Sequence, residues 1–180
     1  MSKGGCAQMS TCSLAALMLA VTVGCSAANG RPGRVHGLPR GDQVVVFFVA
    51  SASSRGSTAS GLREAVLSLH QKLRAEAERQ GLALEVVGVS VDWDVDDGIR
   101  FLRRYGPFDE MVVGGNWVNL AAIEYIWRDQ PGTPTIPQIV VVRRRVDPGP
   151  STIGVGPDQV LGRFVGVEQI VEWAGRSTHF

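Results

Sequence analysis

The sequence has little cysteine: of its 180 residues only three are cysteines, namely Cys6, Cys12 and Cys25. From Ser26 onward the chain therefore has no thiol for a disulfide, a thiolate nucleophile or a cysteine metal site. It also lacks an excess of either charge, because 18 basic residues face 17 acidic ones. This balance gives no broad positive field for nucleic acid, so no nucleic-acid partner is expected.

The N-terminal apolar run, residues 14–23, is too short to span a bilayer and has the length of the apolar part of a signal peptide. It ends in Val-Thr-Val-Gly-Cys, which resembles a bacterial lipobox, where a peptidase cuts before the cysteine and the sulfur is lipidated. Thr22 departs from the aliphatic residue usual at its position, so an ordinary secretory signal or an uncleaved anchor are the alternatives. We expect residues 1–24 to be a lipoprotein signal peptide and Cys25 to carry a lipid anchor. The anchor would hold the chain on the membrane at the periplasmic or extracytoplasmic face of a bacterial cell envelope.

Residues 25–42 are rich in glycine, proline and arginine without an apolar period, which predicts a flexible tether. The folded domain is expected over residues 43–177. Apolar β-branched runs in it predict strands, and apolar residues at a 3.6-residue period predict helices. The predicted strands are residues 44–50, 84–92, a short segment within 107–114, 137–142 and 160–165. The predicted helices are residues 62–80, 96–105, 116–129 and 167–175.

This order of elements predicts an α/β domain with a mixed central sheet of four to five strands flanked by helices. The first strand–helix–strand unit is expected to be right-handed with parallel strands, whereas the last two strands are expected to be antiparallel. Ile136–Pro137 is a candidate cis peptide bond because Pro137 directly precedes an apolar strand, and Pro134 is its rival. That strand is expected to end at the three arginines of residues 143–145.

The acidic run of residues 92–98 invites comparison with a calcium-binding loop. An EF-hand loop counted from Asp92 needs glycine at its sixth position and glutamate at its twelfth, where this chain has Asp97 and Arg103. We therefore interpret the run as the cap of the helix that follows, and predict no metal and no other cofactor. His70 has no carboxylate or cysteine near it in the sequence and is interpreted as a packing or surface residue.

The order of elements and three motifs resemble the thioredoxin-like superfamily, and within it the membrane-anchored periplasmic TlpA-like branch. The motifs are the strand of residues 45–50 with its following loop, Gly-Val-Ser-Val-Asp at 88–92, and Thr-Ile-Pro-Gln-Ile-Val-Val-Val at 135–142. Residues 161–166 are similar to the start of that family's terminal hairpin and helix. The resemblance implies a thioredoxin-like fold in which the loop at the head of the first long helix faces a cis-proline.

The chain departs from this family where the family carries its Cys-x-x-Cys pair. One alignment places Ser53 and Gly56 at the two cysteine positions, and the other places Ser54 and Ser57 there, with Arg55 between them. A serine hydroxyl cannot cycle between dithiol and disulfide, so thiol redox activity is expected to be absent and no catalytic residue is assigned.

The favoured hypothesis is a non-catalytic module that binds extended polypeptide or assembles with an envelope protein, with Ile136 and Pro137 in its binding groove. A second hypothesis is a degenerate member of a thiol-disulfide oxidoreductase family. A third is a hydrolase or transferase that uses a loop serine, with Arg55 and the helix N-terminus holding an anion. The last is a structural domain whose groove has no function.

Overall fold

The structure is a computed structural model that describes residues 40–128, 134–149 and 153–176. The predicted signal peptide, Cys25 and most of the predicted tether lie outside these ranges. Within them, no helix combines the length and the apolar character that crossing a membrane requires.

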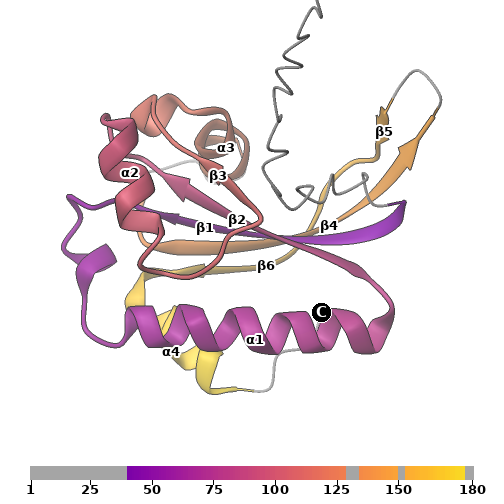
Figure 1. The fold of residues 1–180 in the computed structure, drawn as a ribbon, viewed down its shortest axis with the longest axis horizontal. Helices are drawn as coiled ribbons and strands as arrows, with labels where there is room; N and C mark the ends of the chain where they lie inside the picture. Colours follow the sequence, from indigo (N-terminus) through magenta and orange to yellow (C-terminus); the bar gives the residue numbers. More distant parts are fainter. Residues whose placement is uncertain (1–39, 129–133, 150–152, 177–180) are drawn as a thin grey trace, which may run out of the picture. The chain divides into compact units, whose positions relative to one another are not determined.

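The described residues form a mixed α/β domain built on one six-stranded sheet (Figure 1). The strands run in the order β3-β2-β1-β4-β5, and β6 also pairs with β4. The pairs β1–β2 and β2–β3 are parallel, whereas β4 is antiparallel to β1, β5 and β6. The bounds are β1 Gly41–Ala50, β2 Ala83–Ser90, β3 Glu110–Val112, β4 Gln138–Pro148, β5 Ile153–Val155 and β6 Gln159–Val165. The predicted mixed sheet flanked by helices is thus confirmed.

Helices cover both faces of this sheet. The α-helices are α1 Leu62–Gln80, α2 Val95–Leu102, α3 Leu120–Ala122 and α4 Gly166–Gly175. The shorter helical turns are the 3-10 turns η1 (Gly56–Thr58) and η2 (Asn116–Val118) and the π-helical turn η3 (Ile123–Trp127). The single helix predicted over residues 116–129 is therefore three short pieces, because Asn119 leaves the helical conformation and starts a new turn by accepting a hydrogen bond from the Ala122 amide.

The ends of α1 and α2 follow from local sequence signals. Gly81 follows α1 with φ of 66°, a left-handed conformation that glycine adopts without steric cost. The Asp94 carboxylate accepts a hydrogen bond from the Asp97 amide, 2.8 Å away, at the start of α2. From Asp94 onward the acidic run thus caps the helix, as predicted.

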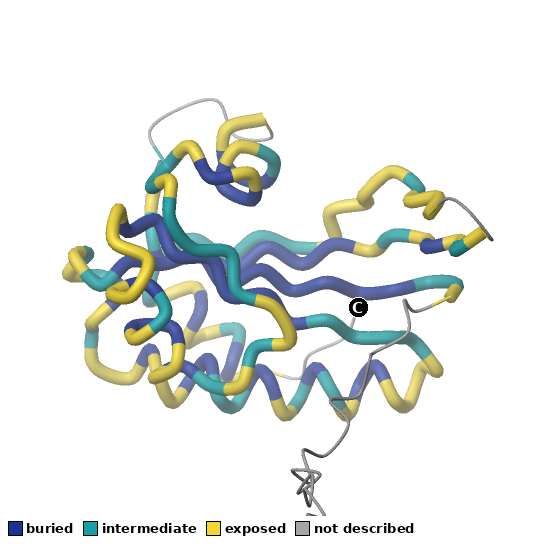
Figure 2. The backbone as a smooth tube through the Cα atoms, turned by 45° about the horizontal axis from the view of Figure 1, so that its top comes forward, coloured by how far each residue is buried: buried dark blue, intermediate teal, exposed yellow. Residues whose placement is uncertain are grey.

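β1 is buried on both faces and divides the core into two clusters (Figure 2). One face, with Val46 and Phe48, packs against the apolar stripe of α1 and against Ile170 of α4. The other face, with Val45 and Phe47, packs against α3 and η3, where Tyr125 stacks on Phe47 at 4.0 Å between ring centroids. This burial explains why β1 is apolar without alternation.

The sheet has one strand more than predicted, because β4 does not end at the arginines of residues 143–145. It continues to Pro148 and pairs with β5. Val146 is buried, and the guanidinium of Arg144 bonds to Asp158, so the arginines lie along a strand rather than at its end. The partner that keeps Arg144 in the strand lies far along the chain, out of reach of a local pattern.

Candidate functional site

The loop between β1 and α1, residues 51–61, lies at one end of the sheet and contains all five predicted loop residues (Figure 1). Ser53 and Arg55 are exposed, Ser54 and Gly56 are half-buried, and Ser57 is fully buried. The Ser57 hydroxyl oxygen accepts a hydrogen bond from the Ser51 amide at 3.2 Å, and its carbonyl accepts one from the Tyr105 hydroxyl. Ser57 therefore closes the loop from inside and is not presented to a ligand.

Asp92 anchors this loop to the end of β2. Its carboxylate accepts hydrogen bonds from the Ser51 hydroxyl at 2.6 Å, the Ser90 hydroxyl at 2.7 Å and the Ala52 amide at 2.9 Å. Burial alone raises the pKa of Asp92, but these hydrogen bonds outweigh burial and lower that pKa below its usual value. The carboxylate is thus a charged acceptor that orders the loop.

A cis-proline faces the loop across a close contact. The Ile136–Pro137 peptide bond is cis, as predicted, whereas the bond before its rival Pro134 starts at residue 133, outside the described residues. A Cβ atom placed on Gly56 would lie 3.0 Å from Pro137 Cδ and 3.2 Å from the Ile136 carbonyl oxygen. Any side chain at position 56 would therefore press on the cis-proline, so glycine gives the loop its close approach.

The backbone at Ile136 makes no hydrogen bond to the described part of the chain. On one side of it, the Thr135 carbonyl accepts a hydrogen bond from the Gln138 side chain, and on the other the Pro137 carbonyl accepts one from the Gly166 amide. Neither the amide nor the carbonyl of Ile136 has a hydrogen-bond partner among the described residues. Both groups thus keep hydrogen-bonding capacity that the described residues do not use.

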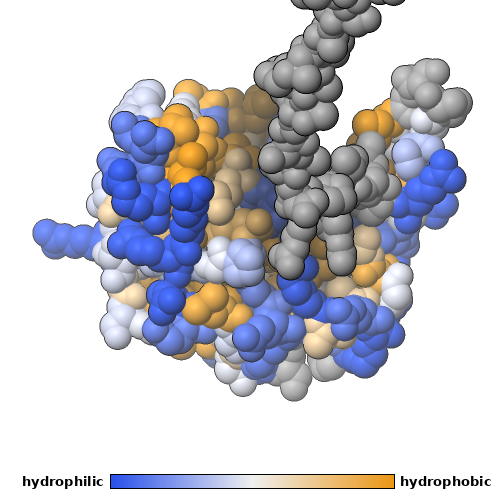
Figure 3. All heavy atoms as spheres, in the orientation of Figure 1, coloured by the Kyte–Doolittle hydropathy of each residue, from blue (hydrophilic) through white to orange (hydrophobic). Residues whose placement is uncertain are grey.

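Exposed apolar side chains surround the end of β2 near this loop. Trp93 follows Asp92 directly and is 75% exposed. Val118 and Leu120 are also exposed and flank Asn119, whose amide group donates a hydrogen bond to the Ser90 carbonyl. Figure 3 shows hydrophobic side chains gathered at the α2 and α3 end of the molecule.

The loop serines have no general base beside them. The Ser51 hydroxyl donates to Asp92, so the Ser53 hydroxyl, 2.8 Å from it, donates to Ser51 in turn. In the described part of the chain no histidine or lysine hydrogen-bonds to a loop serine, and the lowered pKa makes Asp92 a poor proton acceptor. No group of three or more His, Cys, Asp or Glu in that part is placed to hold a metal ion.

The structure thus brings together Gly56, Ile136 and Pro137 among the predicted site residues. Cys25 lies outside the described residues. Sequence reasoning missed the anchoring role of Asp92, which was interpreted as part of the acidic run and as the last residue of the motif at 88–92. The signal for it was the pair of serines at positions 51 and 90, each placed to donate to a shared acceptor at the strand ends.

Comparison with family models, with curated proteins and with solved structures found no match to this chain.

Proposed function

We propose that this chain is a lipid-anchored module of the bacterial cell envelope, with a thioredoxin-like fold, that binds extended polypeptide without catalysis. The observation that carries the proposal is the close approach of Gly56 to the cis peptide bond of Pro137, beside a backbone segment at Ile136 that has no hydrogen-bond partner among the described residues. A free amide and carbonyl at the end of a sheet offer an extended chain the pairing that an added strand would make.

The surroundings of this segment favour an apolar polypeptide. Trp93, Val118 and Leu120 expose large apolar side chains near the same end of the sheet. An unfolded or extended chain with apolar residues would cover them, whereas a folded, polar surface would leave them in water. The absence of cysteine from residue 26 onward fits binding without thiol exchange.

The test uses the purified full chain and a permanently unfolded probe, reduced and carboxymethylated lactalbumin, with native lactalbumin as the folded comparator. Fluorescence anisotropy should detect binding of the unfolded probe alone. Gly56→Val should weaken it about tenfold, because its side chain would displace the peptide groups that pair with the probe. Gly175→Val is the matched control, because a Cβ at Gly175 meets nothing within 4 Å.

A second variant distinguishes a loss of probe binding from a loss of folding stability. Leu120→Ser removes an apolar side chain that is 82% exposed, so it should weaken probe binding about threefold without changing the unfolding midpoint. Equal binding by the Gly56 and Gly175 variants, or equal affinity for native and unfolded probe, would contradict the proposal.

The anchor is tested separately by labelling cells with radioactive palmitate. Cys25→Ser should abolish both the label and membrane association, whereas Cys12→Ser should change neither, because Cys12 precedes the predicted cleavage site. Label retained in the Cys25 variant would refute the lipidation.

A serine enzyme is the second candidate, and the hydrogen-bond chain from Ser53 through Ser51 to Asp92 favours it. A fluorophosphonate probe should label Ser53 if that chain activates its hydroxyl. We expect no labelling, because a carboxylate with a lowered pKa does not remove a proton readily. An insulin-reduction assay should likewise show no dithiol turnover.

A further inference from the structure

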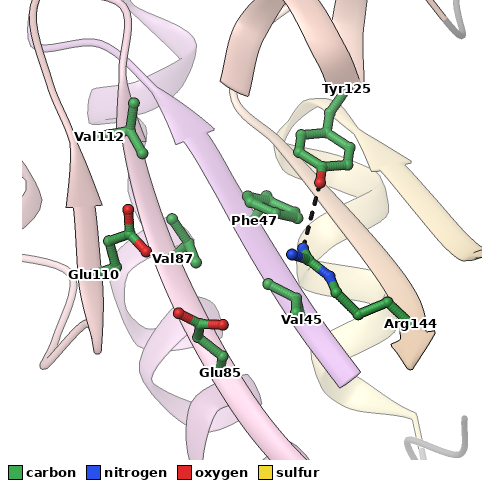
Figure 4. A pocket seen from close by; sticks show the side chains of 8 residues that line it. All are labelled: Val45, Phe47, Glu85, Val87, Glu110, Val112, Tyr125 and Arg144. Atoms are coloured by element: carbon green, nitrogen blue, oxygen red, sulfur yellow. Dashed lines mark hydrogen bonds between the residues drawn. The ribbon is translucent and has the colours of Figure 1, made fainter. Parts of the chain in front are cut away.

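A small pocket lies on the α3 face of the sheet, at the end of the strands away from the serine loop (Figure 4). The hollow measures about 180 Å³. Its apolar lining consists of Val45, Phe47, Val87 and Val112, and its polar lining of Glu85, Glu110, Tyr125 and Arg144. Figure 4 shows the two glutamates on one side and Tyr125 with Arg144 on the other.

Strand register places these side chains on one face. Glu85 of β2 is paired with Val45 of β1, and Glu110 of β3 is paired with Val87 two residues further along β2. Because alternate residues of a strand face the same side, Glu85, Val87 and the residues paired with them project into one hollow. The strand register therefore places the two carboxylates on the same wall of the pocket.

The positive charge in the pocket is already neutralised. Arg144 forms an ion pair with Asp158, with Nε and Oδ1 3.2 Å apart, and lies over the Phe47 ring at 5.9 Å from its centroid. Its Nη2 atom is 3.3 Å from the hydroxyl of Tyr125, which donates a hydrogen bond to Asp158 at 2.7 Å. Arg144 thus has three partners on its own wall.

The glutamate wall has no such compensation. Glu85 accepts one hydrogen bond, from the neutral side chain of Gln43 at 2.6 Å. Neither Glu85 nor Glu110 forms an ion pair with a described residue. Burial raises the pKa of Glu85, and the charges of Glu110 and Asp109 add to that rise, whereas the Gln43 hydrogen bond and the charge of Arg144 act against it. Arg144 on the facing wall offsets part of this charge, but it is already paired with Asp158, so the two glutamates leave the pocket lining with a net negative charge.

From this arrangement we infer that the pocket binds a small organic cation, an ammonium or guanidinium group on a short apolar stem. The cationic group lies between the Glu85 and Glu110 carboxylates, and the stem lies on Val45, Phe47 and Val87. A hard metal ion fits poorly, because calcium takes about six to eight oxygen ligands and this wall offers two carboxylates above apolar side chains. An anion is disfavoured by the same two charges, because Arg144 on the facing wall is already paired with Asp158.

The experiment is isothermal titration calorimetry of the full chain with n-pentylammonium as the probe. Its isosteric comparators are n-pentanol, which is neutral, and n-pentanoate, which is an anion. We expect the ammonium probe to bind at least about tenfold more tightly than either comparator, because only it offsets the excess negative charge of the pocket lining. Equal binding of pentanol, or no binding of the ammonium probe, would overturn the inference.

Variants assign the site. Glu110→Gln should weaken binding of the ammonium probe about fivefold, and Glu85→Gln by a similar factor. Glu78→Gln is the matched control, because Glu78 is exposed on α1, which packs on the opposite face of the sheet. Glu110 is exposed as well, so its variant removes no buried contact and tests the site independently of Glu85→Gln. Unchanged affinity in Glu110→Gln, or an equal loss in Glu78→Gln, would refute the assignment.

A final arm separates a free cation from a protein side chain of the same chemistry. Nα-acetyl-lysine amide carries an alkylammonium on a blocked backbone. Weaker binding of this probe than of pentylammonium supports a small-molecule ligand, whereas tighter binding would assign the pocket to a lysine of another protein and overturn the inference. The probes are unrelated to unfolded polypeptide, so this result stands apart from the peptide-binding test.

Discussion

The two ends of β2 carry carboxylates in opposite situations. Asp92, just past the C-terminal end, accepts hydrogen bonds from two serine hydroxyls and a backbone amide. Glu85, near the N-terminal end, accepts a hydrogen bond from Gln43 alone. The pKa of Asp92 is consequently lowered and that of Glu85 is raised, although burial acts to raise both.

In these two carboxylates the number of hydrogen-bond donors, more than burial, sets the direction of the pKa shift. It also decides whether the carboxylate can still bind an external group. The hydrogen-bonding capacity of the Asp92 carboxylate is occupied within the fold, because its three hydrogen bonds hold the serine loop against β2. Glu85 keeps unused acceptor capacity and forms no ion pair with a described residue, so an external cation can still bind to it. The three predictions that follow test this contrast, from the largest expected effect to the smallest.

Removal of the Asp92 carboxylate should produce the largest effect. Asp92→Ala leaves three donors without their acceptor, so the free energy of unfolding should fall by about 4 kcal/mol in urea titration at neutral pH. Asp96→Asn is the control, because Asp96 is exposed in the first turn of α2, and it should change stability by about 0.5 kcal/mol or less.

The pH dependence of this effect has a definite sign. Because folding lowers the pKa of Asp92, its stabilisation is complete above the pKa of the unfolded state, about 3.9, and is lost as the pH falls through the lower pKa of the folded state. The difference between wild type and Asp92→Ala should therefore shrink below pH ~4. If Asp92→Ala and Asp96→Asn lost equal stability at neutral pH, Asp92 would not be the anchor of the loop.

Protonation of His70 should produce the next largest effect on stability. Its contribution has to be known before the effects of the two carboxylates can be compared at acidic pH. It is buried against Phe108, and its Nδ1 atom has no hydrogen-bond partner among the described residues. Burial, together with the charge of Arg74 and against that of Asp109, lowers the pKa of His70 from 6.5 to about 4. Its imidazole thus stays neutral in the folded state, which agrees with the packing role predicted from the sequence.

The unfolded chain takes up a proton on this histidine at a higher pH than the folded chain does. Stability should therefore fall as the pH drops from 6.5 to about 4, by on the order of 3 kcal/mol in all. His70→Leu should remove most of that slope, measured by urea unfolding at a series of pH values. His36→Leu, in the predicted tether, is the matched control and should keep the slope. A slope that survives in His70→Leu would contradict this assignment.

Much of the sheet could be predicted from the sequence, because strands buried on both faces leave a local signal. β1 was predicted over residues 44–50 and extends over Gly41–Ala50, and β2 ends within two residues of its predicted end. β5 was not predicted, and β4 was predicted to end too early. The reason is that three consecutive arginines indicate a solvated strand end unless a distant partner is known. That partner, Asp158, comes into place only when β4 and β6 pair.

The candidate site divides in the same way. The contact between the serine loop and Pro137 could be anticipated, because the order of elements puts the loop at the strand ends and a proline at the start of the next strand. The Glu85 pocket could not, because Glu85, Glu110 and Arg144 meet only through the register of four strands. The sequence of any one strand predicts only that its charged residue is solvated.

Glu85→Gln should produce the smallest effect, with a sign opposite to that of Asp92→Ala. The Glu85 carboxylate faces Gln43 on β1, Glu110 and Asp109 at β3, and Arg144 on β4, and its pKa is raised, so its ionised form is disfavoured in the folded state. A neutral glutamine removes that cost and can still accept the Gln43 hydrogen bond. The variant should thus gain on the order of 0.5 kcal/mol at neutral pH.

This gain should vanish in acid, because below the pKa of the unfolded state the wild-type carboxyl is protonated in both states. Glu78→Gln, an exposed change on α1, should leave stability unchanged at either pH. If Glu85→Gln instead destabilised the chain at neutral pH as Asp92→Ala does, the Glu85 carboxylate would already be satisfied by the protein. The contrast between the two ends of β2 would then fail, and the pocket would have no charge left for a cation.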